Sequence, residues 1–89
     1  MKYDIRINEY GTKCYYVNNE LHREDGPAIE SLNGNKIWFR NGKCHRKDGP
    51  AVEFANGKKE WHLNNKCYGY NNDFTDESWK RFVKTLIFS

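Results

Sequence analysis

Two copies of a His-Arg-x-Asp-Gly-Pro motif are the residues of this sequence that could carry chemistry. They occupy residues 22–27 and 45–50, so they recur 23 residues apart. In a catalytic site the histidine could act as a base, the arginine could hold an anion and the aspartate could orient the histidine. A motif that recurs at a turn more often serves the turn: the aspartate caps the Asp-Gly-Pro backbone and the arginine pairs with it. No serine or cysteine nucleophile has a matched base and no Gly-rich phosphate loop precedes a helix. We therefore expect a protein that is not an enzyme, with no catalytic residue and no cofactor.

Anion binding is a further role open to the motif. The two His-Arg dipeptides fall on the same return turn of successive repeats, so they should form a row about 9.5 Å apart along one sheet border. A guanidinium matches phosphate in bidentate fashion, and a nearby aromatic ring could stack on a base. For an anionic, nucleotide-like small molecule, the candidate binding residues are His22, Arg23, His45, Arg46, Arg40, Trp38 and Tyr68. The competing account is that each arginine is fully engaged by its own aspartate.

Metal binding is not predicted. One repeat is two strands, so His22 and His45 would have to lean together across an intervening strand. The cysteines, at positions 14, 44 and 67, form no Cys-x-x-C pair, so no zinc knuckle is encoded. Their odd number, and the lack of a basic-then-apolar leader, favour a reducing cytoplasm.

The motif belongs to a longer repeat that predicts β-structure. Asn33-Gly34 and Asn56-Gly57 separate strand-like runs and are typical of two-residue hairpin turns. Closing the first hairpin there would place Ile29 opposite Trp38, and the second would likewise place Val52 opposite a tryptophan. We predict a mainly β fold: an antiparallel β-meander of repeated hairpins, with about six strands over residues 2–70.

The first strand leaves two registers open. The predicted hairpins give the sheet an aromatic face, made of Tyr15, Val17, Ile29, Trp38, Val52, Phe54, Trp61 and Leu63. Residues 2–8 alternate, with Tyr3, Ile5 and Ile7 on one side, but the repeat register would put Arg6 on this aromatic face. A one-residue bulge near Tyr10-Gly11 would repair this, and otherwise the strand feeds the second face.

The C-terminal segment changes to a helical period. Its apolar residues fall at i, i+3, i+4 and i+7: Trp79, Phe82, Val83 and Leu86. Thr75 is a suitable N-cap, and acidic residues fill the first turn. The pattern predicts a helix near residues 76–86 whose apolar stripe packs on the aromatic face.

Composition bounds the remaining possibilities. The chain has 89 residues, which fits a single domain over residues 1–89. Fifteen Lys and Arg face twelve Asp and Glu, for a net charge of +3. A charge this small, with both signs interspersed, does not favour nucleic acid as a partner. A mean hydropathy of −1.05 excludes a membrane-spanning segment.

The repeat resembles the membrane occupation and recognition nexus (MORN) repeat in a variant form. The residues that carry the resemblance are Asn41-Gly42-Lys43-Cys44-His45, Ala55-Asn56-Gly57 and Trp61. The usual glycine after the histidine is replaced here, and the resulting His-Arg-x-Asp-Gly-Pro-Ala repeat is similar to repeats in small proteins of bacteriophages and giant viruses. The resemblance covers roughly residues 11–86 and implies a twisted β-meander used for binding, scaffolding or self-association. Lipid binding is a poor transfer because no basic cluster stands out.

Two non-enzymatic functions follow. The first is a phage binding protein that works in the host cytoplasm and sequesters or blocks a host component, such as a defence signalling molecule or a host protein. The second is a structural or assembly module that self-associates through its open sheet edges. In either case we expect a homo-oligomer, formed through the strand at residues 2–8 or through the mixed face around Phe39.

Overall fold

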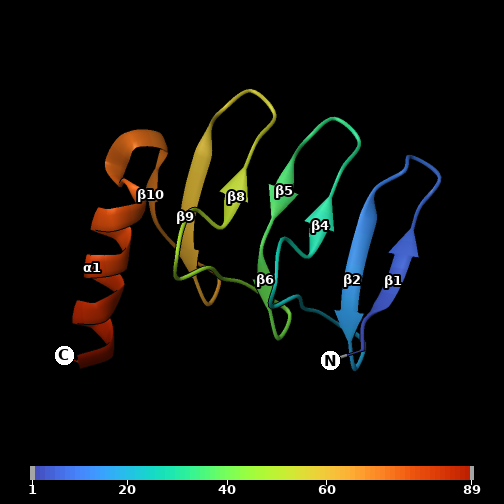
Figure 1. Ribbon diagram of the computed structural model, residues 1–89, viewed down its shortest axis with the longest axis horizontal. Helices are drawn as coiled ribbons and strands as arrows, with labels where there is room; N and C mark the ends of the chain where they lie inside the picture. Colours follow the sequence, from blue (N-terminus) through green and yellow to red (C-terminus); the bar gives the residue numbers. More distant parts are fainter. Residues whose placement is uncertain (1, 89) are drawn as a thin grey trace.

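The computed structural model describes residues 2–88 as a row of antiparallel hairpins that ends in one helix (Figure 1). The predicted domain, residues 1–89, reaches one residue beyond the described range at each end. The strands are β1 (Asp4–Ile7), β2 (Lys13–Val17), β3 (Glu20–Leu21), β4 (Ile29–Glu30), β5 (Lys36–Ile37), β6 (Phe39–Arg40), β7 (Lys43–Cys44), β8 (Val52–Glu53), β9 (Lys59–Leu63) and β10 (Lys66–Tyr70). They are followed by a short 3₁₀ helix, η1 (Asn71–Asp73), and by the helix α1 (Asp76–Phe88).

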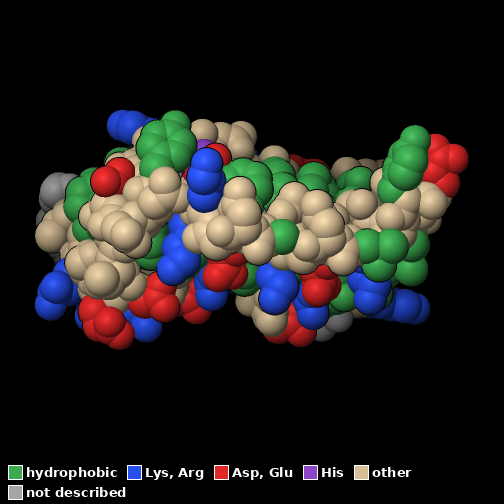
Figure 2. Space-filling model, turned by 90° about the horizontal axis from the view of Figure 1, so that it is seen from above, with side chains coloured by type: hydrophobic (Ala, Val, Ile, Leu, Met, Phe, Trp, Pro, Cys, Tyr) green, Lys and Arg blue, Asp and Glu red, His purple; other side chains and the backbone are tan. Residues whose placement is uncertain are grey.

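The strands follow one another across the molecule, with β1 at one end and α1 at the other (Figure 1). The main sheet has the order β1-β2-β4-β5-β8-β9-β10, β3 pairs with β2, and β6 and β7 form a separate pair. All pairs are antiparallel. The predicted antiparallel meander with one C-terminal helix is therefore confirmed. Charged side chains of both signs are interspersed along one side of the molecule (Figure 2).

The predicted hairpin register is wrong by one residue. Ile29 pairs with Ile37 and Val52 pairs with Glu60, instead of with the tryptophan that follows each. Side chains alternate between the two faces of a strand, so the shift exchanges the residues that share the face of the tryptophans. Alanines, not β-branched residues, now share that face, and Ala28 is completely buried there.

The reason is a three-residue loop in place of the expected two-residue turn. In the first of these hairpins the Ser31 N–H donates to Asn35 O at 3.0 Å and the Gly34 N–H donates to Ser31 O at 3.0 Å. Gly34 takes a positive φ of 99°, whereas its neighbour Asn33 does not, which is the pattern of a type I turn followed by a glycine bulge. The same loop ends at Gly11 and Gly57, with φ of 78° and 89°.

The first strand uses this loop as well, which settles its register. Ile5 pairs with Tyr15, so Tyr3, Ile5 and Ile7 lie on the face of the large aromatic rings. The Tyr3 ring meets the Tyr15 ring edge-on, with centroids 5.7 Å apart. The bulge at Tyr10-Gly11 is thus the alternative that the structure adopts.

Two-residue hairpin turns do occur, one strand later in each repeat. Both central residues of such a turn need positive φ, which asparagine and glycine tolerate best. The three turns are Asn18-Asn19 (φ 51° and 65°), Asn41-Gly42 (φ 52° and 77°) and Asn64-Asn65 (φ 50° and 70°). These extra hairpins are why residues 2–88 contain ten short strands and not about six.

The helix lies against the β9–β10 end of the sheet (Figure 1). Thr75 Oγ1 accepts the Ser78 N–H at 3.1 Å and Ser78 Oγ accepts the Thr75 N–H at 2.8 Å, which caps its first turn. Three of the four predicted stripe residues pack on the sheet and form the main core, which is made of Trp61, Leu63, Trp79 and Val83 with Tyr68, Phe74 and Phe82 around them. The fourth, Leu86, is 38% exposed and lies outside this core.

Candidate functional site

Both motif histidines bind the backbone of the next repeat. The Asn41 N–H donates to Nδ1 of His22 at 2.9 Å, and the Asn64 N–H donates to Nδ1 of His45 at 3.1 Å. Each of these asparagines opens a two-residue hairpin turn. An Nδ1 that accepts a hydrogen bond belongs to a neutral ring whose proton is on Nε2. The motif histidine is therefore a connector between successive repeats.

His45 has a lowered pKa that matches this role. Burial is the largest cause, and the positive charges of Lys47 and then Arg40 add to it. Protonation would place a proton on the Nδ1 atom that receives the Asn64 N–H. The two cations therefore flank an imidazole that stays neutral.

Each motif arginine is held over an aromatic ring of its own repeat. The guanidinium carbon of Arg23 lies 4.0 Å from the centre of the Tyr15 ring, and that of Arg46 lies 3.9 Å from the centre of the Trp38 ring. Such cation–π contacts contribute roughly 0.5–2 kcal/mol each. The aromatic surface of each repeat is thereby covered by an arginine.

The same guanidinium closes the Asp-Gly-Pro turn. Arg46 donates through Nε to Asp48 at 3.0 Å and through Nη1 to the carbonyl of Pro50 at 3.1 Å. Arg23 repeats both bonds one repeat earlier and also donates to Glu30 Oε1 at 2.8 Å. The hydrogen bond from Arg23 lowers the pKa of Asp25, its partner in the turn. The arginines therefore serve the turn, as the account of full engagement by the aspartates expects.

The glycine of the motif leaves room for this close approach. A Cβ at Gly49 would lie 2.9 Å from the guanidinium carbon of Arg46, and one at Gly26 would lie 3.0 Å from that of Arg23. Neither glycine has a positive φ. The motif thus encodes one packed unit, in which the guanidinium fills the space that a side chain would take.

The third repeat replaces the arginine by the helix. Gly69 stands where the 23-residue spacing would place the next arginine, and Trp61 is the ring that this arginine would have covered. Phe74 and Trp79 cover the Trp61 ring instead, with centroids 5.6 Å away in both cases. A Cβ at Gly69 would lie 3.0 Å from Phe74, so an arginine has no room there.

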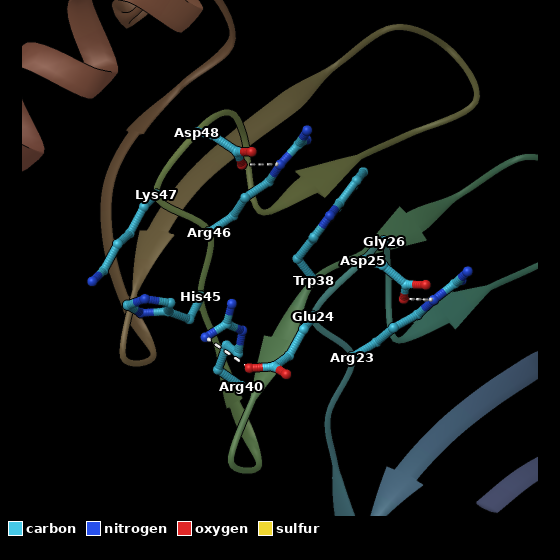
Figure 3. Close-up of a pocket in the computed structure, with 10 residues that line it drawn as sticks. All are labelled: Arg23, Glu24, Asp25, Gly26, Trp38, Arg40, His45, Arg46, Lys47 and Asp48. Atoms are coloured by element: carbon cyan, nitrogen blue, oxygen red, sulfur yellow. Dashed lines mark hydrogen bonds and ion pairs between the residues drawn. The ribbon is translucent and has the colours of Figure 1, made fainter. Parts of the chain in front are cut away.

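A cleft of about 500 Å³ lies between the return turns of the first two repeats. We call it the return-turn cleft. Trp38 lies between the two Arg–Asp pairs, and Arg40 and His45 lie below the Arg46–Asp48 pair (Figure 3). The lining residues are Arg23, Glu24, Asp25, Gly26, Trp38, Arg40, His45, Arg46, Lys47 and Asp48.

The cleft brings together five of the seven predicted anion-binding residues: Arg23, Trp38, Arg40, His45 and Arg46. His22 does not line it, because its ring is buried, with 7% of the residue exposed. Tyr68 does not line it either, because it packs on Trp79 and Phe82 of the helix, with ring centroids 6.0 Å and 5.3 Å away.

Five residues of the cleft were not among the predicted anion-binding residues: Glu24, Asp25, Gly26, Lys47 and Asp48. Of these five, only Glu24 and Lys47 lie outside the fixed positions of the motif. Glu24 and Lys47 occupy the x position of the His-Arg-x-Asp motif in the two repeats. The motif residues around them make the contacts that hold the turn. The x position also faces the cleft, and it is a position of the motif that differs between the two copies. That difference is the signal in the sequence that could have found them.

Besides the two turn arginines, the cleft contains two further cations, Arg40 and Lys47, and Arg40 is only loosely held. Arg40 lies 3.8 Å from Glu24, and about half of each side chain is exposed. Such an exposed pair contributes little to stability and exchanges readily with a competing anion. The lining carries four basic and three acidic side chains, with the basic surplus on the Arg40, His45 and Lys47 side.

Over residues 2–88, no group of three or more His, Cys, Asp or Glu side chains is arranged to hold a metal ion. In the same range, no helix has the length and apolar character needed to cross a membrane.

No family model, curated protein or solved structure matches this chain. The resemblance to MORN repeats therefore stays a prediction from the sequence.

Proposed function

We propose that the protein is a non-enzymatic binding protein that holds a small, phosphate-bearing molecule of the nucleotide class in the return-turn cleft. The observation that carries the proposal is the convergence of Trp38, Arg40, His45 and Lys47 on one cleft of about 500 Å³. A volume of this size is in the range of small-molecule sites.

In this proposal the turn arginines line the binding site, and Arg40 and Lys47 bind the phosphate of the ligand. Arg23 and Arg46 are held by aspartate and proline carbonyl groups, so they are preorganised. Arg40 can leave the weak contact with Glu24 and turn to a phosphate, with Lys47 on the other side of His45. A phosphate there would replace a carboxylate that carries less charge, which favours exchange.

The histidines support binding over catalysis. The Nδ1 atoms of His22 and His45 each accept a backbone N–H, and the remaining ring nitrogen then carries the proton. A neutral histidine in that state has no lone pair to offer as a general base. We therefore assign His45 a positioning role between Arg40 and Lys47.

The biological role that we propose rests on the resemblance to phage and giant-virus repeat proteins. A small binding protein of a phage, working in the host cytoplasm, would act by sequestering a nucleotide-like signal of host defence. Blocking a host protein is the alternative within the same class, and it would leave the cleft without a nucleotide ligand.

Isothermal titration calorimetry tests the proposal. The probes are ATP, ADP, cyclic mononucleotides, cyclic dinucleotides and inorganic phosphate. We expect at least one nucleotide to bind, and the Arg40→Ala/Lys47→Ala variant to lose that binding while its melting temperature stays near that of the wild type. Lys58→Ala, an exposed lysine in a hairpin loop, is the matched control for loss of charge and should bind normally. Absence of binding by every probe, or equal binding by the double variant, would refute the proposal.

A further inference from the structure

We propose that two copies of this chain pair through β1, antiparallel, with a two-fold axis at Ile5, so that the sheet of one copy continues into the other. This inference concerns the edge of the sheet and does not depend on a ligand in the return-turn cleft. The occupant of the edge is a second copy of this chain, and the argument rests on hydrogen-bond direction, charge and exposure.

The hydrogen bonds within the sheet fix which backbone groups of β1 face outward. The Asn8 N–H donates to Thr12 O at 3.1 Å, so the backbone N–H and C=O groups of Asn8 point toward β2. In an antiparallel pair, every second residue points its backbone N–H and C=O groups toward the neighbouring strand, so those of Arg6 and Asp4 also point toward β2. The Tyr15 N–H, opposite Ile5, donates to Ala28 O at 2.8 Å and so points away from β1.

The outward groups are therefore those of Tyr3, Ile5 and Ile7. With a two-fold axis at Ile5, the N–H and C=O groups of Ile5 pair with those of Ile5 in the second copy. Those of Tyr3 pair with those of Ile7 in the second copy, and the reverse. Every outward backbone group of the strand finds a partner, which is the condition for adding a strand to a sheet edge.

The charges of the strand select this register. A two-fold axis at Ile5 places Asp4 of each copy opposite Arg6 of the other. Moving the axis by one residue keeps the outward groups paired but places Asp4 opposite Asp4, or Arg6 opposite Arg6. Opposite charges across a strand pair stabilise it and like charges destabilise it. In the single chain Arg6 already lies 2.9 Å from Asp4, so the two groups are in place to form the pairs.

The apolar side chains of the edge need a cover. Ile5 is 50% exposed and Ile7 is 64% exposed, on the same face as Tyr3. Hydrophobic side chains are also visible at this end of the molecule, on the right in Figure 2. The opposite end of the sheet is covered by α1, whereas within residues 2–88 only β2 pairs with β1. Repeat arrays need both ends covered, and a second copy covers this one.

Sedimentation equilibrium and disulfide trapping test the inference together. At a chain concentration of about 100 μM we expect an average mass well above that of one chain for the wild type, because even a dimer with a Kd near that concentration would already hold about half of the chains. Ile5→Cys should form a disulfide between copies on mild oxidation, because opposing Cα atoms lie about 5.5 Å apart. Ile7→Cys is the register control and should not form one, since the two copies of residue 7 would lie about 14 Å apart. The oxidised wild-type chain is the control for any disulfide that the native cysteines, Cys14, Cys44 and Cys67, form between copies.

Charge reversal gives an independent reading. Asp4→Arg alone and Arg6→Asp alone should each weaken the dimer about tenfold or more, and the double variant should restore it. Ile5→Pro removes only an outward N–H and should give a folded monomer. A monomeric wild type, equal trapping of Ile7→Cys, a double variant that stays weak, or a folded Ile5→Pro variant that remains dimeric would overturn the inference. Nucleotide binding is also measured on the Ile5→Pro monomer, so that failure of the dimer proposal and failure of the cleft proposal can be told apart.

Discussion

Replacing Trp79 by alanine should remove most of the stability of the protein. Trp79 is completely buried, and its ring centroid lies 4.9 Å from that of Phe74 and 5.6 Å from that of Trp61. Its indole N–H donates to the Arg46 carbonyl at 2.9 Å, which connects the helix to the second repeat. Truncating a buried aromatic side chain costs about 3–5 kcal/mol. A chain of 89 residues has a total stability of roughly 4–13 kcal/mol. The variant should therefore be marginally folded or unfolded.

Urea unfolding followed by far-ultraviolet circular dichroism measures this loss without relying on tryptophan fluorescence. Trp79→Phe keeps a ring in the core but leaves the Arg46 carbonyl without its donor, so it should cost about 1–3 kcal/mol. Leu32→Ala, at a side chain that is 82% exposed, is the control and should change stability by less than about 0.5 kcal/mol. Melting of Trp79→Ala close to that of the wild type would show that the helix is not part of the cooperative fold, which would refute the reasoning.

Three other predictions follow from single contacts. Cys44 is buried and its pKa is raised to about 11, chiefly by burial, so iodoacetamide at neutral pH should label it only after unfolding, as mass spectrometry of the labelled native and denatured chains will show. Because the pKa of His45 is lowered, its imidazole binds a proton less readily in the folded chain than in the unfolded chain. The stability that the neutral His45 contributes is therefore present above the ordinary pKa of 6.5 and is lost as the pH falls through the lowered pKa. In urea unfolding, the stability difference between the wild type and His45→Gln should shrink from about pH 7 to about pH 5, and a constant difference would contradict this. Arg46→Ala should cost about 1–3 kcal/mol and Asp48→Ala a smaller amount of the same sign, measured by thermal melting, whereas unchanged melting of both would show that the turn does not need the pair.

The sequence predicted the elements of the fold better than their pairing. The 23-residue repeat and the stripe at Trp79, Phe82 and Val83 were enough for the meander and the helix, because periodicity depends on local geometry. The register was missed because Asn-Gly occurs in two different hairpin loops of each repeat. At Asn41-Gly42 both residues take positive φ, whereas at Asn33-Gly34 only the glycine does. The dipeptide alone does not distinguish the two loops.

The residues of the candidate site were predicted only in part, because the repeat spacing locates the turns but not the contacts between repeats. The spacing placed Arg23 and Arg46 on one border of the sheet, and the cleft between the turns contains both. His22 and His45 were both predicted as candidate anion-binding residues, but only His45 lines the cleft, and the Nδ1 atoms of both accept backbone N–H groups of turns 19 residues further along the chain. The partner of each histidine belongs to the next repeat, so it becomes visible only when the repeats are stacked.

The most direct test of the proposed function is the pKa of His45, followed by nuclear magnetic resonance with and without a nucleotide. His45 lies between Arg40 and Lys47, and those charges help to keep its pKa low. A phosphate bound between the two cations would neutralise them, so the account predicts that a saturating nucleotide raises the pKa of His45 and shifts the indole signal of Trp38. A pKa of His45 that does not move at saturation, or signals that shift only along the helix, would contradict the account.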